Sequence, residues 1–288
     1  VLAFGAILAP FLIYIPINPD TLPKVWEKDG ERVSRDTLVQ KSCPARQHTV
    51  RWDDFSQHHY ELTFAICKSD AQKSAQNRNN AGWFPDGHYD YQRLIDHDRA
   101  LLNDIQAQLD TIATRKQLNS LQKLEMVLTF VQHIEYAMVH PETCAELRQK
   151  AQSHWLKADF SDQWHLGTAS YTPKNGRTVN PCEENIQQYG VLSPVEFLYR
   201  LQGDCDSRTV FLYTLLRSMR YDVIILNSDV LHHSLLGVAL DGISYNNGVL
   251  YQKNAFSPRY TICETTTSIA MGVFPNFNAR DWVEVGTF

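Results

Sequence analysis

The feature that most restricts the fold is a four-residue step, Gly203-Asp204-Cys205-Asp206, which leads directly into an apolar run from Arg208 to Met219. The run has a helical pattern, which predicts that Cys205 lies in the first turn of a helix with Asp204 as its N-cap. The unpaired N–H groups and partial positive charge of a helix N-terminus favour a thiolate over a thiol. Because a thiolate attacks carbonyl carbon, Cys205 is the best candidate for a nucleophile.

A cysteine nucleophile needs a base that takes its proton and a group that orients the base. Two adjacent histidines, His232 and His233, stand at the start of an apolar stretch typical of a strand, and Glu264 ends a later stretch of the same kind. Side chains alternate along a strand, so only one of the two histidines can face the thiol. Each residue alone has an ordinary structural interpretation, since buried cysteines usually only pack. The hypothesis of a site therefore depends on the order cysteine, histidine, glutamate.

The second half of the chain predicts helices followed by an antiparallel sheet. Ser193, Pro194 and Glu196 form a helix start, with Ser at the N-cap, Pro at the first position and Glu at the third. That helix is expected to end near Gly203, where the Cys205 helix follows. Apolar stretches then alternate with turn signals, and the expected strands cover residues 223–226, 234–240, 248–252 and 259–264. This order is typical of an α+β fold.

In the first half, the stretches His48–Trp52 and Tyr60–Cys67 predict a hairpin. Residues 68–89 show no periodicity and are expected to form a long loop. From Tyr91 to Tyr136, apolar residues recur at helical spacing, and Asn119 or the next residue is a suitable cap. We interpret these apolar stripes as core-packing faces without a ligand role.

Residues 1–17 are wholly apolar apart from the hydroxyl of Tyr14, and the run is slightly shorter than the ~20 residues that span a bilayer. We interpret this run as a truncated membrane anchor; a signal-peptide remnant and a buried segment are the alternatives. Residues 18–90 are then a linker and a small hairpin region, and residues 91–288 a catalytic domain. The expected location is the membrane, facing the periplasm or the cell exterior.

The six cysteines include no pair in CxxC spacing, which argues against a zinc ribbon or a thioredoxin motif. Two of them bracket the expected hairpin and two bracket a polar region. These four are the candidates for structural disulfides in an oxidising compartment: Cys43, Cys67, Cys144 and Cys182. Cys205 and Cys263 are expected to stay reduced. The alternative is six thiols in a cytosolic protein.

Charge and histidine pattern limit the other classes of function. The formal net charge is −5 and the chain has no run rich in Lys or Arg, so nothing favours nucleic-acid binding. A metal-dependent hydrolase that uses some of the eleven histidines, such as His58, His59 and His165, is a rival hypothesis. Neither HExxH nor another metal-ligand spacing supports it, and we expect no metal and no cofactor.

Several segments carry a resemblance to a known family. Ser193–Val223 resembles the core of bacterial transglutaminase-like cysteine proteins, in which P-x-E-T-L is followed by G-D-C-D/E-D and L-G-Y-D-V. Phe130–Tyr136 is similar to the F-V-Q-x-I-x-Y stretch that precedes this core. His233–Val238 resembles the histidine strand, and Cys263–Thr266 resembles the acid step, often written E-T-T. The resemblance covers roughly residues 120–270.

The resemblance implies a papain-like α+β core, in which the nucleophile helix packs on an antiparallel sheet, and a Cys-His-Asp/Glu triad. Carried over by position, Cys205 is the nucleophile, His233 the base and Glu264 the orienting acid. His233 is preferred to His232 because the apolar strand follows it directly. Family activities include peptide-bond cleavage, amide hydrolysis and acyl transfer to amines, without a cofactor. The expected partners are a protein or peptide substrate and the membrane.

For the oxyanion of such a reaction we expect the backbone N–H of Cys205 as one donor, with Gln202 or Trp164 as a weaker candidate for the second. The chain departs from the family pattern at Ser207 and Arg208. Arg208 lies within one turn of the thiol and either favours the thiolate or marks a site that no longer turns over.

A second departure is Arg220, which stands where the family has a turn glycine. These departures define the alternative function, a catalytically inactive transglutaminase-like binding subunit of a membrane protein assembly.

Overall fold

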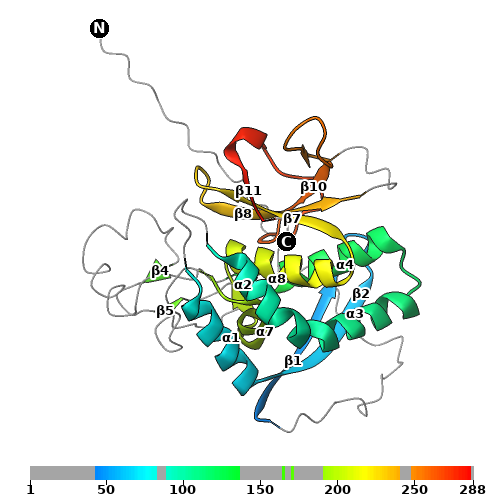
Figure 1. Cartoon of the computed structure of the whole chain (residues 1–288). Coiled ribbons are helices and arrows are strands. Elements are labelled where there is room, and N and C mark those ends of the chain that lie inside the picture. Colours follow the sequence, from blue (N-terminus) through cyan, green and yellow to red (C-terminus); the bar gives the residue numbers. More distant parts are fainter. Residues whose placement is uncertain are drawn as a thin grey trace. The chain divides into compact units, whose positions relative to one another are not determined.

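The computed structural model describes residues 43–82, 89–136, 191–240 and 248–286, and the backbone of two short strands, β4 (Trp164–His165) and β5 (Ser170–Tyr171). The four long segments belong to one compact unit, Gln40–Phe288 (Figure 1). They combine helices with an antiparallel sheet, which confirms the α+β class. The expected anchor over residues 1–17 lies outside the described residues, as do Cys144 and Cys182.

A hairpin opens the described part of the chain, as the sequence predicts. Strands β1 (Ala45–Asp53) and β2 (His59–Cys67) pair antiparallel over nine residues each. A disulfide between Cys43 and Cys67 ties its open end, with the two Cα atoms 5.8 Å apart. On the buried face, the Trp52 ring lies 5.1 Å from the Phe130 ring, which brings the hairpin into the main core.

The expectation of a loop over residues 68–89 is wrong for its first part, which forms helix α1 (Lys68–Asn80). The buried positions of this helix are Ala71, Ser74 and Arg78, which follow helical spacing but include only one apolar residue. An apolar pattern could not reveal such a helix. Its stability comes from tertiary packing, including an ion pair of 2.7 Å between Arg78 Nε and Glu196 Oε2, both almost fully buried.

The region from Tyr91 to Tyr136 is helical, as predicted. It contains α2 (Tyr91–Asp98), the 3₁₀ turn η3 (Arg99–Leu102), α3 (Asn103–Arg115) and α4 (Ser120–His133). Asn119 is the cap of α4, because its side-chain oxygen accepts from the Gln122 N–H and its own N–H donates to the Gln122 side chain, each at 3.0 Å. The middle of α4 is buried on all sides, which makes it the central helix of the core.

Two further helices lead to the proposed nucleophile. Helix α7 (Pro194–Arg200) begins at the predicted cap, where Glu196 Oε2 accepts from Ser193 Oγ at 2.8 Å. After it, strand β6 (Gln202–Gly203) pairs in parallel with β3 (Glu135–Tyr136). Helix α8 (Cys205–Ser218) follows at once and ends before Arg220, whose φ of 68° lies in the left-handed region that favours glycine.

The sheet contains the four predicted strands and one more. In spatial order it reads β11 (Val283–Gly286), β7 (Asp222–Ser228), β8 (His233–Ala239), β10 (Tyr260–Cys263) and β9 (Leu250–Tyr251), all antiparallel. No local pattern predicts β11, which is preceded by the short turn η4 (Ala279–Asp281).

Both faces of the sheet are covered. Helix α8 packs along β7 and β8 on one face (Figure 1). Along β7, Val223 and Ile225 join the core shared with the helices, whereas Ile224 and Leu226 join a second cluster with Trp282. Because both faces of β7 are buried, its sequence is a continuous apolar run and does not alternate between apolar and polar residues.

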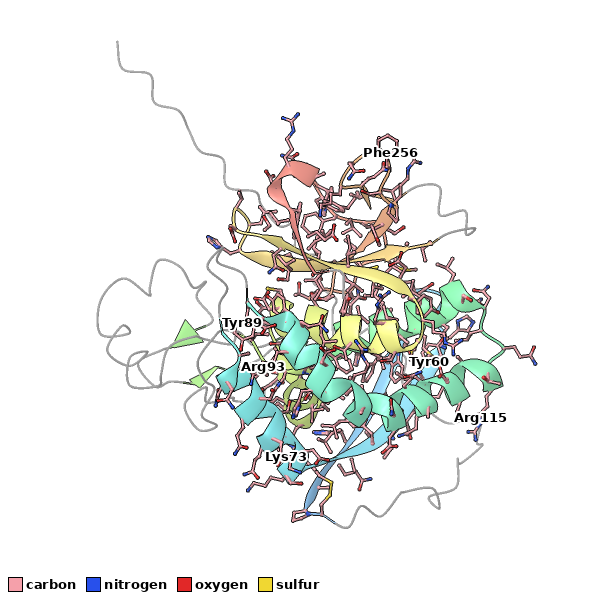
Figure 2. The ribbon with its side chains drawn as sticks, viewed as in Figure 1. Tyr60, Lys73, Tyr89, Arg93, Arg115 and Phe256 are labelled. Carbon is pink, nitrogen blue, oxygen red and sulfur yellow. A yellow bond between two sulfur atoms is a disulfide. The ribbon has the colours of Figure 1, made fainter. Side chains whose placement is uncertain are left out.

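At its outer edge the sheet carries an exposed aromatic residue. Phe256, between β9 and β10, is 99 % exposed and projects from the molecule (Figure 2).

Among the described residues, none of the helices combines the length and the apolar character that crossing a membrane requires.

Candidate active site

Cys205 is the first residue of α8, as predicted from the four-residue step. Asp204 is the N-cap, and its Oδ1 accepts from the Ser207 N–H at 3.1 Å and from Ser207 Oγ at 2.7 Å. Cys205 is 8 % exposed and reduced, and Cys263 is reduced and fully buried. The structure thus fixes a free thiol at a capped helix start.

The predicted base and acid lie in direct contact. His233 is the first residue of β8, and its Nε2 lies 2.7 Å from Oε2 of Glu264, the residue that follows β10. Strands β8 and β10 are paired neighbours, which brings these two positions together although 31 residues separate them. The preceding histidine, His232, has a φ of 48° and is exposed, so only His233 joins this contact.

The carboxylate of Glu264 is held on both oxygens. Its Oε1 accepts from the backbone N–H and from Oγ1 of Thr266, both at 2.7 Å, which leaves Oε2 for His233. Burial raises the pKa of Glu264, but the hydrogen bond and charge of His233 and the two bonds from Thr266 outweigh it, so the pKa lies below its usual value. Glu264 therefore stays ionised and fixes Nε2, so that Nδ1 is the ring nitrogen left to exchange a proton.

The thiol itself has a different environment from the one expected. Burial, followed by the negative charges of Asp206 and Asp204, raises the pKa of the Cys205 thiol well above its usual value. The backbone N–H groups of Ser234 and Asp206 interact with the sulfur and act in the opposite direction. The helix start alone thus does not make a resting thiolate, because the two carboxylates beside it oppose the charge. The Ser234 contact also places the sulfur next to the start of β8.

A polar cluster beside the thiol was not anticipated from the sequence. Asp206 Oδ1 accepts from Tyr91 Oη at 2.9 Å and from Ser234 Oγ. Asn227 completes the cluster, with Nδ2 donating to Tyr91 Oη at 3.2 Å and Oδ1 lying 2.8 Å from Ser234 Oγ. Asp206 belongs to the four-residue step and was within reach of sequence reasoning. Tyr91 was not, because it lies 115 residues away on α2.

Arg208 has a structural role that neither sequence interpretation included. The side chain is fully buried, and it donates from Nε to Gly203 O at 3.0 Å and from Nη1 to Val131 O at 2.8 Å and Thr265 O at 3.1 Å. Nη2 donates to Ile134 O. Burial lowers the pKa of Arg208 to about 10, so it remains charged at neutral pH. The guanidinium joins the end of α4, strand β6 and the acid step around the thiol.

Gln132 supports the acid from the other side. Its Nε2 donates to Glu264 O at 2.8 Å and to Ile269 O at 2.9 Å, so α4 holds the backbone that carries the carboxylate. The ring of His233 lies against two aromatic rings, with centroid distances of 6.4 Å to Phe274 and 6.2 Å to Trp282. His233 is therefore restrained by packing as well as by its hydrogen bond.

The two weak oxyanion candidates remain predictions. Gln202 lies in β6, three residues before Cys205, and is half-buried. Trp164 lies in β4, and its side chain is outside the described residues, as is that of His165. The other two histidines of the metal hypothesis contact separate aspartates, His58 Nδ1 at 2.8 Å from Asp54 Oδ2 and His59 Nδ1 at 2.5 Å from Asp53 Oδ1.

Comparisons with protein-family models, with curated proteins and with solved structures found no match to this chain.

Proposed function

We propose that the chain is a thiol-dependent acyl-transfer enzyme with a papain-like, transglutaminase-like core, in which Cys205, His233 and Glu264 form the triad. The observation that carries the proposal is the 2.7 Å contact between His233 Nε2 and Glu264 Oε2, beside a reduced cysteine at a helix start. The backbone N–H of Ser234, the residue after His233, interacts with the Cys205 sulfur, which supports a common site for the proposed base and nucleophile. Oriented bases of this kind are the usual partners of a cysteine nucleophile.

In the proposed reaction, Cys205 Sγ attacks a carbonyl carbon while its proton passes to His233 Nδ1. The tetrahedral intermediate collapses to a thioester, and the leaving amine takes the proton from His233. Water or a second amine then attacks the thioester while His233 Nδ1 takes a proton from it. As the second tetrahedral intermediate collapses to the acid or the new amide, His233 gives this proton to the departing Cys205 thiolate. Glu264 stabilises the positive charge on the imidazole while it holds the proton. Water as the acceptor gives a peptidase or amidase, and an amine gives a transamidase.

The rise in the pKa of Cys205 suits general-base catalysis during the attack rather than a preformed ion pair. The same observation favours the second candidate, a catalytically inactive binding subunit, because a buried protonated thiol is also what an inert cysteine shows. The two candidates differ in one measurable property, whether Cys205 accepts an acyl group.

The proposed location is the membrane, with the domain facing the periplasm or the cell exterior and a protein or peptide as substrate. The Cys43–Cys67 disulfide supports an oxidising compartment. The apolar run over residues 1–17 supports the anchor.

Acylation by p-nitrophenyl acetate tests the proposal. We expect a burst of p-nitrophenolate and one acetyl group on Cys205 in the mass spectrum. Cys205→Ala should remove both, whereas Cys263→Ser, a change at the other reduced cysteine, should retain both. Absence of acetyl-Cys205 in the folded wild-type protein would exclude the enzyme and leave the binding subunit.

Incubation with casein then separates the two reactions. A peptidase releases peptides from casein, and a transamidase incorporates dansylcadaverine into it. Both activities should disappear in Cys205→Ala.

A further inference from the structure

We propose that Asp206 is a positioning residue of the Cys205–His233 pair: its carboxylate accepts a hydrogen bond from Ser234 Oγ and so holds the start of β8 against the start of α8, where the thiol lies. The inference rests on the proposed function, because it assigns a role toward the same nucleophile and base. Its function would be to keep Cys205 as a thiol until His233 removes the proton during attack.

The hydrogen bonds of Asp206 connect three elements, α8, β8 and α2. Asp206 lies in the first turn of α8, directly after the nucleophile, and Ser234 directly follows the base on β8. The hydrogen bond from Ser234 Oγ to Asp206 Oδ1 therefore ties the residue after the nucleophile to the residue after the base. Tyr91 Oη donates to the same oxygen at 2.9 Å and fixes the carboxylate from α2. A single carboxylate oxygen thus links α8 to both β8 and α2.

The charge of Asp206 acts on the thiol of Cys205. Burial is the largest cause of the raised pKa of the Cys205 thiol, and the charge of Asp206 is the second. Burial raises the pKa of Asp206, while the hydrogen bonds of Ser234 and Tyr91 and the charge of His233 oppose this rise. Among the described residues, the titratable or charged groups around Cys205 and His233 come from five places besides Asp206. They are Tyr91 from α2, Tyr136 from β3, Asp204 and Arg208 around the start of α8, His233 from β8 and Glu264 after β10.

Two substitutions separate the two parts of the role. Asp206→Asn removes the charge and retains an oxygen that accepts from Ser234 and Tyr91. Ser234→Ala removes the tether and retains the charge. If Asp206 acts as proposed, the first changes the ionisation of the thiol, and the second slows acylation without changing that ionisation.

The experiment measures alkylation of Cys205 by iodoacetamide in the full chain between pH 6 and pH 10, with peptide mass spectrometry to distinguish Cys205 from Cys263. In the wild type, the rate constant should still rise above pH 9, because only the thiolate reacts. In Asp206→Asn the rising limb should move to lower pH, with a roughly tenfold faster reaction at pH 8, since a nearby carboxylate changes a pKa by about one unit. Asp222→Asn, the same change beyond the opposite end of α8, is the matched control and should leave the profile in place.

Ser234→Ala should keep the wild-type alkylation profile and lower the rate of acetylation by p-nitrophenyl acetate at least tenfold. It also tests the tether if Asp206→Asn fails to fold, which circular dichroism will show. Wild-type acetylation in Ser234→Ala, or an Asp206→Asn profile that coincides with the wild type, would overturn the inference. An unchanged acetylation rate in His233→Ala would instead overturn the proposed function, so the two failures are distinguishable.

Discussion

His233 Nε2 lies 2.7 Å from Glu264 Oε2, and the same carboxylate is held at its other oxygen by Thr266. The imidazole is thus fixed by a fully bonded carboxylate on one side and by the rings of Phe274 and Trp282. Such an arrangement costs conformational freedom for both side chains. It is what a base needs if Nδ1 is to meet one thiol repeatedly in one orientation.

Glu264→Gln should lower the rate of acetylation of Cys205 by p-nitrophenyl acetate by roughly 10²–10⁴-fold, the usual contribution of general acid–base catalysis. The amide keeps the size of the side chain but no longer stabilises a protonated imidazole. Glu61→Gln on the exposed face of β2 is the control. Acetylation at the wild-type rate in Glu264→Gln would contradict the role of this residue.

The same carboxylate should contribute to stability in a pH-dependent way. The folded pKa of Glu264 lies below its ordinary value of 4.5, so the contribution is present above about pH 4.5 and is lost as the pH falls through the folded pKa. Urea unfolding at pH 6 and pH 3.5 should therefore show a stability difference between the wild type and Glu264→Gln that shrinks at the lower pH. A stability difference between the two proteins that is larger at pH 3.5 than at pH 6 would contradict a lowered pKa of Glu264 in the folded state.

Arg208→Met should destabilise the fold by about 3 kcal/mol or more, because four buried carbonyl groups lose a charged donor. Urea unfolding measures the change. Arg217→Met, on the exposed last turn of the same helix, should cost at most ~0.5 kcal/mol. Similar effects of the two substitutions would show that the carbonyl contacts of Arg208 carry little stability.

The double substitution Cys43→Ser and Cys67→Ser should lower the free energy of unfolding by about 3 kcal/mol, the amount expected for a disulfide across a sequence separation of 24 residues. Peptide mapping without reductant should recover the Cys43–Cys67 pair from the wild type. Equal urea midpoints for the variant and the oxidised wild type would show that the bridge does not form.

Much of the fold near the site could be predicted from local patterns. The caps Asn119, Ser193 and Asp204 were found because a capping side chain bonds to residues two or three positions away, so that its signal is local. Helix α1 was missed because its buried stripe is largely polar, and Arg78 is satisfied by Glu196, 118 residues away. Strand β11 gave no local signal at all, since only its pairing with β7 defines it.

Local sequence patterns predict the parts of the site whose chemistry is local: a cysteine at a capped helix start, a histidine at the head of a strand, and a glutamate at the end of another. The tertiary structure decided what these parts face. The pairing of β8 with β10 joins His233 to Glu264, and the packing of α8 on β8 places Asp206 against Ser234. Burial by segments distant in sequence and the charges of the flanking Asp206 and Asp204 together raise the pKa of Cys205. A helix N-terminus favours a thiolate in isolation, whereas the burial that the fold imposes and the carboxylates of Asp204 and Asp206 oppose it.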